Sequence, residues 1–260
     1  MEFHVITLFP EMFESPFRGG MIGRAIEQGI IAIKAHPLRE HGLGNYRQVD
    51  DAPYGGGSGM VMRPEPIAAA IDAVDAARPG LWRILMTPQG APLTQEKVRE
   101  LAARTPGLLL IAGRYEGVDE RVRVMVDEEI SIGDYVLSGG ELPALVVIDA
   151  IARLLPGTLG RAESAEQESF SDGLLDWPHY TRPQVIDGHE VPAVLMSGDH
   201  AAVRRWRLQQ ALGRTWLRRP ELLERRGMSE EERILLEEFQ FERAKARGDS
   251  KTVNDEGDYL

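Results

Sequence analysis

The sequence predicts an α/β domain with a mainly parallel sheet, followed by a smaller helical domain. Apolar segments of strand length alternate with helical segments over residues 1–155, which is typical of this class. Residues 108–112 are wholly apolar, as expected of a central parallel strand that is covered on both faces. From about Gly198 the chain has helical character only, which indicates that a second domain follows.

In the first domain, strands are expected at short apolar runs, and helices where a capping residue or proline opens a longer segment. The strands are expected at residues 3–8, 30–35, 82–86, 108–112 and 130–132. The helices are expected at residues 21–28, 64–76 and 142–154, with a further helix that begins at Thr94. Residues 36–60 are polar and glycine-rich, and the length of this stretch indicates a functional loop.

The second half of the chain divides by composition. Residues 156–176 are polar and lack periodicity, which predicts a flexible linker. Helices are expected at residues 199–212 and 229–246, and Ser229 with Glu232 forms a capping box at the start of the second helix. The predicted domains are residues 1–160, a linker at 161–176, a helical domain at 177–246 and a disordered tail at 247–260.

Composition excludes several classes of site. The 260 residues include no cysteine, which excludes disulfides, thiolate zinc sites and a cysteine nucleophile. The six histidines lack the spacing of a helical zinc site, so no metal-binding residues are predicted. The longest apolar stretch, residues 142–152, is too short to span a bilayer, and no basic region of a secretory signal precedes an apolar run. These features predict a cytoplasmic protein without a membrane partner.

Charge is unevenly distributed along the chain. The net charge is −11, yet residues 204–219 contain six arginines and no acidic residue. This arginine-rich segment carries +6, so the rest of the chain carries −17. Arginine binds phosphate through a fork of donors, and Trp206 and Trp216 suit stacking on unpaired bases. The alternative is that the tryptophans lie in a core and the arginines on a helix exterior.

Three glycine-containing loops are candidate ligand sites. Residues 54–59 lack the Gly-Lys-Ser/Thr of a P-loop and the third glycine of a dinucleotide fingerprint, so a mobile surface loop is the simpler interpretation. Residues 113–121 and 131–143 each follow a predicted strand, where α/β sheets bind ligands. The apolar side chains at 132 and 135–137 suit the walls of an adenine slot. Ordinary turns between strand and helix are the alternative.

Residues 166–183 form a fourth candidate, because this stretch carries Phe, Trp, Tyr, His and Arg among its acids. Acids in a linker are usually only solvated. The aromatic and basic side chains exceed what a tether needs, which favours ordering on a partner.

In this order, these segments resemble the bacterial tRNA (guanine-N1)-methyltransferase family of the SPOUT superfamily, the trefoil-knot methyltransferases. The resemblance covers nearly the whole chain. It is carried by residues 6–13, 49–60, 88–90, 113–121, 131–143, 173–183, 204–207 and 214–223.

The resemblance implies an α/β domain with a deep C-terminal trefoil knot (SPOUT-like) and a small all-helical C-terminal domain. It implies a homodimer whose active sites are shared between subunits, with tRNA rather than DNA as the partner. The implied reaction moves a methyl group from S-adenosyl-L-methionine to N1 of guanosine 37, next to the anticodon. Assistance by Mg²⁺ is also implied, without a site built from protein side chains alone.

By family position, Glu168 is the base that accepts the N1 proton, and Arg153 stabilises the developing negative charge. Family members often carry aspartate where Glu168 stands, and an aromatic residue where Leu85 or Met86 stands. The implied cofactor-binding residues are Pro88, Gly113, Tyr115, Glu116, Ile132, Gly133, Asp134, Tyr135, Val136, Leu137, Gly139, Gly140 and Pro143. The implied RNA-binding residues are Asp172, Asp176, Arg182, Arg204, Arg205, Trp206, Arg207, Arg214 and Trp216.

Three alternatives stay open at this point. Residues 51–54 have a faint similarity to the Asp-Pro-Pro-Tyr signature of Rossmann-type enzymes that methylate exocyclic amines, but the glycine fingerprint is missing. A non-catalytic RNA-binding protein would need the arginine-rich segment but not the loops at 113–121 and 131–143. The remaining alternative is another RNA base methyltransferase of the same superfamily.

Overall fold

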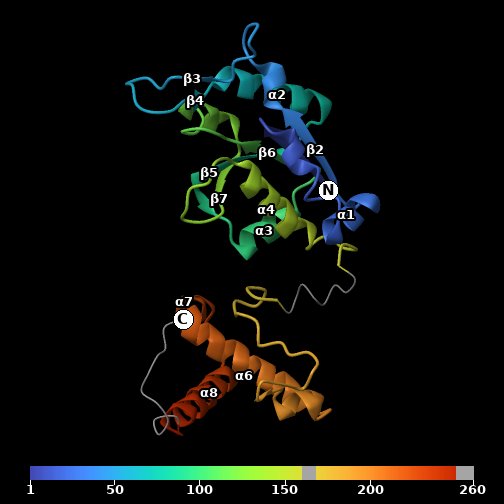
Figure 1. Ribbon diagram of the computed structural model, residues 1–260, viewed down its shortest axis with the longest axis vertical. Helices are drawn as coiled ribbons and strands as arrows, with labels where there is room; N and C mark the ends of the chain where they lie inside the picture. The colour runs from blue at the N-terminus through green and yellow to red at the C-terminus, as the bar shows by residue number, and fades with distance from the viewer. Residues whose placement is uncertain (160–167, 250–260) are drawn as a thin grey trace. The chain divides into compact units, whose positions relative to one another are not determined.

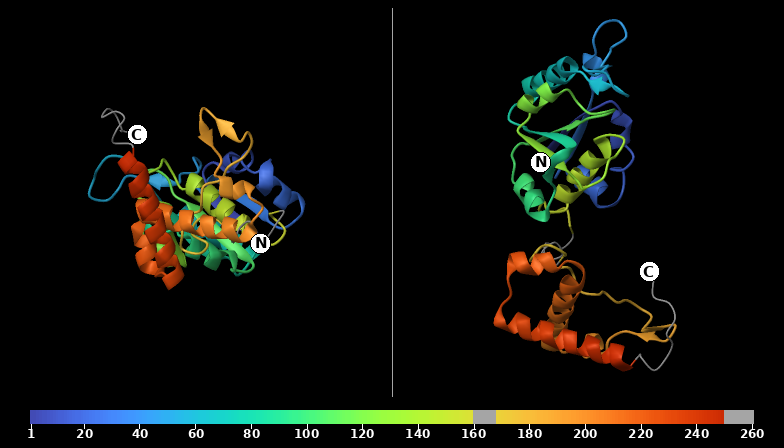
Figure 2. Two further views of the ribbon diagram at one scale, coloured as in Figure 1. Left: turned by 90° about the horizontal axis from the view of Figure 1, so that it is seen from below. Right: turned by 90° about the vertical axis from the view of Figure 1, so that its left-hand side faces the viewer.

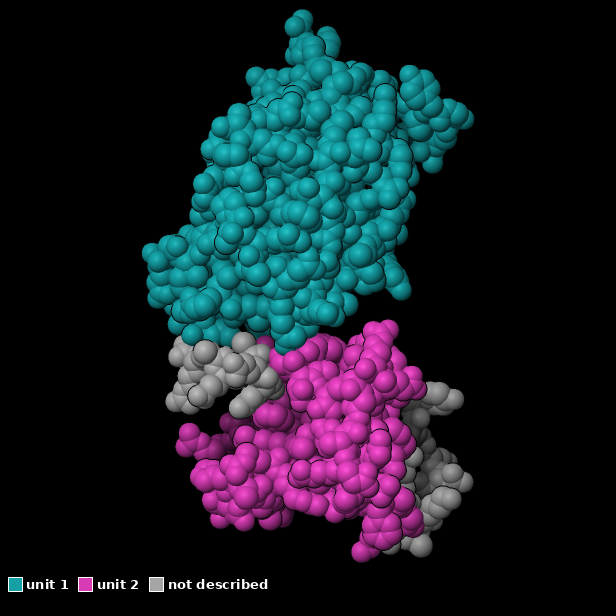
Figure 3. All heavy atoms as spheres, turned by 180° about the vertical axis from the view of Figure 1, so that it is seen from behind, with its two compact units in different colours: residues 1–162 teal, residues 163–260 magenta. Residues whose placement is uncertain are grey.

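The computed structural model of the protein describes residues 1–159 and 168–249. The chain forms two compact units, residues 1–162 and 163–260, which Figure 3 distinguishes by colour. Each unit has its own hydrophobic core. The part of the predicted linker at 161–167 and the part of the predicted tail at 250–260 lie outside the described residues.

The first unit contains a five-stranded sheet with helices on both faces (Figure 1). The strands lie in the order β2-β1-β6-β5-β7, and every neighbouring pair is parallel. Their bounds are β1 (Glu2–Thr7), β2 (Ala32–Pro37), β5 (Trp82–Pro92), β6 (Gly107–Ala112) and β7 (Glu128–Ser131). The helices are α1 (Gly20–Glu27), α2 (Pro64–Ala77), α3 (Gln95–Ala102) and α4 (Glu141–Ala152). The prediction of an α/β domain with a mainly parallel sheet is confirmed.

Side chains of β6 alternate between two cores. Leu108 and Leu110 pack into the core that α1, α3 and α4 cover, whereas Leu109 and Ile111 pack into the core that α2 covers. All four side chains are fully buried. This two-sided burial explains why the strand is apolar at every position and confirms its predicted central place.

All five strands form near their predicted positions with shifted ends, and the shifts are largest for β2 and β5. Strand β2 begins at Ala32 rather than at residue 30, because the amides of Ile30 and Ile31 bond the carbonyl of Ala25 and close the end of α1. Strand β5 continues beyond Met86 to Pro92, with an irregularity in its pairing with β7 between Met86 and Ala91. The extension brings residues 87–92 into the sheet edge that forms the candidate site.

The long glycine-rich stretch is partly ordered by a short antiparallel pair. Strand β3 (Asp50–Asp51) pairs with β4 (Val61–Met62), and the glycine-rich residues 54–59 lie between them. A 3₁₀ helix, η2 (Leu38–His41), comes before the pair, and its Leu38 is fully buried. The loop is therefore fixed to the first unit at both of its ends.

The second unit is built on α6 (His200–Arg218), α7 (Pro220–Arg226) and α8 (Glu230–Asp249). Helices α6 and α8 pack together (Figure 2), with Leu212, Leu235 and Leu236 in their core. Helix α6 extends past its predicted end to Arg218, and Gly213 within it lies against the ring of Phe239, where a Cβ would overlap that ring. The predicted capping box is confirmed, with the amide of Glu232 donating to Ser229 Oγ over 3.2 Å.

The prediction of an all-helical second domain is wrong in one detail. Strands β8 (Val185–Ile186) and β9 (His189–Glu190) form a small antiparallel hairpin. Asp187 and Gly188 connect them with φ angles of 49° and 78°. An Asp-Gly pair favours the left-handed turn that a two-residue hairpin requires, so the local sequence explains the hairpin.

The described part of the predicted linker packs onto the helices of the second unit. Residues 168–176 form turns, and Leu174, only 7% exposed, belongs to the same core as Leu212 and Leu235. Within the described ranges, no helix is both long and apolar enough to cross a membrane.

A histidine pair makes the first unit sensitive to acid. His4 Nδ1 lies 2.9 Å from His36 Nε2, and the rings stack with centroids 5.1 Å apart. Burial lowers the pKa of His36 from 6.5 to about 4, and the charge of His4 acts in the same direction. Burial also lowers the pKa of His4, against its contact with Glu2. The unfolded chain therefore binds more protons between pH 6.5 and 4, and stability falls as the pH is lowered through this window.

We expect His36→Gln to reduce the acid dependence of the melting temperature. The variant lacks the imidazole whose pKa is about 4 in the folded protein, so unfolding no longer takes up a proton at this position. Thermal melts at a series of pH values between 7 and 4 measure the effect, with His189→Gln in the exposed hairpin as the matched control. If His36→Gln and wild type lose the same number of degrees across this range, the pair does not cause the acid sensitivity.

Candidate active site

A cavity of about 410 Å³ opens at the carboxyl ends of β5, β6 and β7. Strand β6 leads directly into Gly113, and β7 leads into Ile132, so both predicted ligand loops contribute walls. This is the edge of an open α/β sheet where ligands bind. The predicted cofactor residues that line the cavity are Pro88, Gly113, Tyr115, Glu116, Ile132, Gly133, Tyr135, Val136, Leu137, Gly139, Gly140 and Pro143.

The structure does not bring Asp134 to the cavity lining. Asp134 is exposed in the loop between Gly133 and Tyr135. Further lining residues were not predicted as cofactor contacts: Leu85, Met86, Thr87, Gln89, Arg114, Gly117, Val118, Glu120, Arg123, Glu129, Ile130, Ser131 and Ser138. Six of them lie within the predicted loops, at 114, 117, 118, 120, 131 and 138, and the others lie on β5 or β7 or beside a loop, so the position of each strand end was the available signal.

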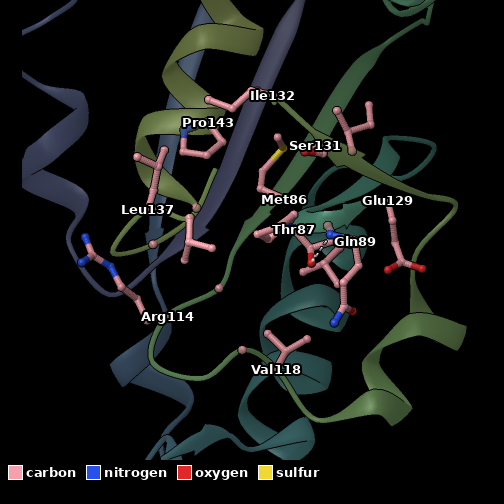
Figure 4. A pocket seen from close by; sticks show the side chains of 18 of the residues that line it. Met86, Thr87, Gln89, Arg114, Val118, Glu129, Ser131, Ile132, Leu137 and Pro143 are labelled. Carbon is pink, nitrogen blue, oxygen red and sulfur yellow. Dashed lines mark hydrogen bonds between the residues drawn. The ribbon is translucent and has the colours of Figure 1, made fainter. Parts of the chain in front are cut away.

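The two ends of the cavity differ in chemistry (Figure 4). Ile132, Leu137 and Pro143 form an apolar side, whereas Gln89 and Glu129 lie at the opposite end. An apolar side with nearby glycine backbone suits a flat heteroaromatic ring. This polar end, in which the Glu129 carboxylate pairs with Arg123 over 2.6 Å, suits a hydrophilic, charged group. The cavity therefore matches an elongated ligand with one aromatic and one charged end.

A buried ionic network holds the two loops together. Glu141 is fully buried at the start of α4, and its Oε2 lies 2.8 Å from Arg114 Nε. Its Oε1 accepts a hydrogen bond of 2.8 Å from Thr7 Oγ1 on β1. Arg114 also donates to the backbone oxygen of Ser138 over 3.2 Å. Since a buried carboxylate is costly without partners, this network fixes the loops to each other and to the sheet.

Two glycines permit the close approach of these loops. The amide of Gly140 donates to the carbonyl of Gly113 over 2.8 Å. A Cβ on Gly140 would lie 2.7 Å from Ala112 Cα, and one on Gly139 would overlap the side chains of Arg114 and Glu141. The glycines are therefore required by packing between the loops, whatever ligand binds.

The end of residues 113–121 has a structural role. The Asp119 carboxylate accepts from Arg121 Nε over 2.8 Å and from the amide of Arg121 over 2.9 Å. These bonds lower the pKa of Asp119 to about 2. Asp119 also caps the 3₁₀ helix η3 (Glu120–Met125), and neither member of the pair lines the cavity.

The glycine-rich loop at 54–59 lies beside the loop at 113–121. The amide of Glu116 donates to the carbonyl of Met60 over 3.0 Å, and the amide of Met62 donates to that of Gly117 over 2.9 Å. Gly59 packs against the Glu116 side chain so closely that a Cβ would overlap it. Burial raises the pKa of Tyr115, and the nearby Asp50 carboxylate acts in the same direction. Loop 54–59 thus borders the cavity through Glu116.

The two predicted catalytic residues belong to different units. Arg153 follows α4 in the first unit, is half-buried and does not line the cavity. Glu168 begins the described part of the second unit, and its carbonyl accepts a hydrogen bond of 3.1 Å from the amide of Ser171.

The arginine-rich segment forms most of α6 and is partly neutralised. Arg205 pairs with Glu238 of α8 over 2.7 Å, and Arg219 pairs with Glu221. Both glutamates lie outside residues 204–219, so the charge of that segment alone did not reveal them. Helix packing brings Glu238 close, and the turn after α6 brings Glu221 close. Arg204 is exposed and forms no ion pair within residues 1–159 and 168–249.

Aromatic side chains surround the first half of α6. The Trp206 ring lies 6.4 Å from that of Tyr180, and the Arg207 guanidinium lies 5.0 Å from the Trp177 ring. Trp216 is 39% exposed and Trp206 is half-buried, so neither is a fully buried core residue. Trp177 and Tyr180 belong to the candidate stretch at 166–183, although neither was named among the individual RNA-binding residues.

The remaining predicted RNA-binding residues lie in different surroundings. Asp172 pairs with Arg226 over 3.1 Å, and Asp176 Oδ2 lies 2.8 Å from His179 Nε2. Arg182 is exposed, whereas Arg214 is half-buried on α6. The two acids therefore serve contacts inside the second unit.

Comparison with known proteins identifies relatives that match most of the chain. The family model described as tRNA (Guanine-1)-methyltransferase TrmD matches residues 1–225. A Methylococcus capsulatus protein named tRNA (guanine-N(1)-)-methyltransferase is 58% identical over 252 residues, covering 95% of this chain and 100% of that protein. Proteins of the same name from Syntrophotalea carbinolica and Serratia proteamaculans are 53% and 55% identical, over 92% of this chain and 97% and 94% of theirs. The chain therefore belongs to the tRNA (guanine-1)-methyltransferase TrmD family.

Proposed function

We propose that this protein transfers a methyl group from S-adenosyl-L-methionine to N1 of guanosine 37 of tRNA. The observation that carries the proposal is the cavity at the carboxyl ends of β5, β6 and β7 in a member of this family. Relatives that share more than half of their residues with this chain bear the name of this activity. Residues 1–160 would bind the donor, 161–176 would link the domains and carry the base, and 177–246 would bind tRNA.

The cavity suits the proposed donor in size and chemistry. Its volume of about 410 Å³ lies in the range of small-molecule sites. The apolar side at Ile132, Leu137 and Pro143 would pack on the adenine ring, and the glycine loops would supply backbone hydrogen bonds. Gln89 and Glu129 would face the amino-acid end. The sulfonium of the donor supplies an already activated methyl group.

Guanine N1 becomes a good nucleophile only when its proton leaves. The protein must therefore supply a proton acceptor and stabilise the negative charge that develops on O6. We propose that the carboxylate of Glu168 accepts this proton and that the guanidinium of Arg153 stabilises the charge on O6. In the shared active site of the proposed homodimer, both side chains would act on one guanine base.

A homodimer with shared active sites is part of the proposal. Helix α4 exposes Leu142 and Val146, which are 46% and 45% exposed, and the neighbouring loop exposes Tyr135 and Val136. An apolar surface of this kind suits a second copy of the chain. Light scattering is expected to give about twice the chain mass of 28.9 kDa. A mass equal to one chain would contradict the dimer.

The trefoil knot belongs to the proposal as well. Residues 113–114 contact 139–140, with an isolated bridge between Arg114 and Gly139 and the hydrogen bond from Gly140 to Gly113. This close contact between two loops at one sheet edge supports threading of the segment that leads into α4.

We propose a cytoplasmic enzyme, because its substrate is tRNA. Mg²⁺ is proposed only as an accessory ion. Within the described ranges, no three His, Asp or Glu side chains gather in a group that could hold a metal ion. No step is therefore assigned to Mg²⁺.

Arg204→Ala and Trp206→Ala are expected to weaken tRNA binding. Arg204→Ala should lose one phosphate contact. The slope of the logarithm of the tRNA association constant against log salt concentration should therefore become shallower by about one unit. Loss of base stacking should weaken binding at every salt concentration for Trp206→Ala. Filter binding over a salt series measures both effects.

Arg233→Ala on α8, which removes an exposed arginine paired with Glu230, is the matched control. Unchanged affinity of both variants would assign the segment a structural role only.

The proposed function is tested by incubating the protein with methyl-labelled donor and a tRNA transcript that has guanosines at positions 36 and 37. We expect label in the tRNA, and none when guanosine 37 is replaced by adenosine. A DNA oligonucleotide with the anticodon-loop sequence should stay unlabelled. Label in both transcripts would favour the alternative, another RNA base methyltransferase of the same superfamily.

A further inference from the structure

The turn at residues 168–176 has a defined backbone. The amide of Phe170 donates to the carbonyl of Leu174 over 2.7 Å, and the amide of Ser171 donates to that of Glu168 over 3.1 Å. Leu174 is buried in the core of the second unit. Glu168 thus begins a closed turn that is packed on the helices.

One hydroxyl fixes this turn to α6. Thr215 is fully buried, and its Oγ1 accepts a hydrogen bond of 2.9 Å from the amide of Leu175. The same hydroxyl donates to the carbonyl of Ala211, one helical turn earlier, over 2.7 Å. Donation to Ala211 fixes the orientation of the hydroxyl and leaves its lone pairs available to Leu175. Two hydrogen bonds of one side chain therefore define where the turn lies along the helix.

Two further contacts fix the parts of the turn on either side of Leu174. The amide of Asp176 donates to Ser169 Oγ over 2.9 Å, and Ser169 is the residue next to Glu168. Arg226 Nε donates to the carbonyl of Asp172 over 2.6 Å, and Arg226 Nη2 also contacts Glu232 Oε1 over 2.7 Å. The turn is thus connected to α6, α7 and α8.

We propose that Thr215 is a positioning residue that aligns Glu168 with the RNA bound to α6. The inference rests on the proposed function, in which Glu168 accepts the N1 proton. Because Arg204 and Trp206 lie on the same helix as Thr215, RNA bound to α6 and the turn that carries the acid form one rigid piece. Loss of the Thr215 hydroxyl removes the bond between α6 and the amide of Leu175 but leaves the RNA-binding surface of α6 in place.

Thr215→Val and Thr215→Ser in the full-length protein test this role. Valine keeps the shape and removes both hydrogen bonds, whereas serine keeps the hydroxyl. At saturating tRNA and donor, we expect the single-turnover methylation rate of Thr215→Val to fall about tenfold or more. Its Kd for tRNA should change by less than about twofold, and Thr215→Ser should keep a rate close to wild type. A wild-type rate for Thr215→Val, or a loss of tRNA binding as large as the loss of rate, overturns the proposal.

The double variant Glu168→Gln with Thr215→Val separates positioning from general damage. If Thr215 acts through Glu168, the double variant methylates as slowly as Glu168→Gln alone. A further drop of about tenfold would instead show that Thr215 supports the fold independently of the acid, and would overturn the proposal. Wild-type turnover by Glu168→Gln would reject the assigned base itself. If Glu168→Gln methylates slowly and Thr215→Val methylates at the wild-type rate, only the positioning role of Thr215 is rejected.

Discussion

Glu168→Gln is expected to slow methyl transfer by about 10²–10⁴-fold while leaving donor affinity unchanged. Glutamine preserves the size of the side chain, but its neutral amide cannot accept the N1 proton at neutral pH. Glu168 lies in the second unit, outside the donor cavity, so the substitution leaves the lining residues intact. Single-turnover kinetics with labelled donor measure the rate, and calorimetry measures donor binding.

The matched control for this prediction is Glu224→Gln. This change removes the same charge from an exposed position on α7 of the same unit. It should methylate at the wild-type rate. If Glu168→Gln is equally fast, another group accepts the proton, and the assignment carried by family resemblance is wrong at this residue.

Gly140→Ala is expected to weaken donor binding by about 10²-fold or more. Gly140 has φ near −81°, a conformation that alanine readily adopts, so backbone strain does not contribute. The added Cβ would instead lie 2.7 Å from Ala112 Cα and would disturb the hydrogen bond to Gly113. Because these atoms join the two loops of the cavity, the change alters the donor site directly. Calorimetric titration with the donor measures the loss.

Gly19→Ala is the control for the steric argument. Gly19 precedes α1, has φ near −134°, and a Cβ there would meet no atom within 4 Å. It should bind the donor as wild type does. Wild-type affinity in Gly140→Ala would show that the loops tolerate separation, and would remove the packing explanation for this glycine.

Local sequence patterns predicted most elements of the first unit. Residues 108–112 become a buried strand because an apolar side chain at every position suits only a strand covered on both faces. Thr94 caps α3 by accepting from the amide of Lys97 over 3.2 Å, as its position before the helix predicted. The strand was predictable from its apolar composition, and the helix start was predictable from a capping residue close to it in sequence.

Elements that depend on distant contacts were predicted less well. Helix α6 continues through Gly213, which lies against Phe239, twenty-six residues later in the chain. The start of β2 was missed for a local reason, because the amides of Ile30 and Ile31 bond the carbonyl of Ala25 and close α1 instead of joining the sheet. The hairpin at 185–190 is different, because its Asp187-Gly188 turn was visible in the sequence and was overlooked.

The site shows the same division. The loops at 113–121 and 131–143 were predicted because each directly follows a predicted strand, and both line the cavity. The network of Arg114, Glu141 and Thr7 joins residues 134 positions apart, which no local pattern predicts. The methyl donor, guanine N1 and the roles of Glu168 and Arg153 came from family resemblance, because residue chemistry alone reached only a ligand cavity and an arginine-rich helix.

The most direct test of the central claim is mass mapping of the methylated product. A tRNA transcript with guanosines at 36 and 37 is incubated with protein and donor, digested with ribonuclease, and analysed by chromatography and mass spectrometry. We expect 1-methylguanosine in the fragment that contains position 37 and no other methylated nucleoside. A methyl group at another position, or on another atom of guanosine 37, would contradict it.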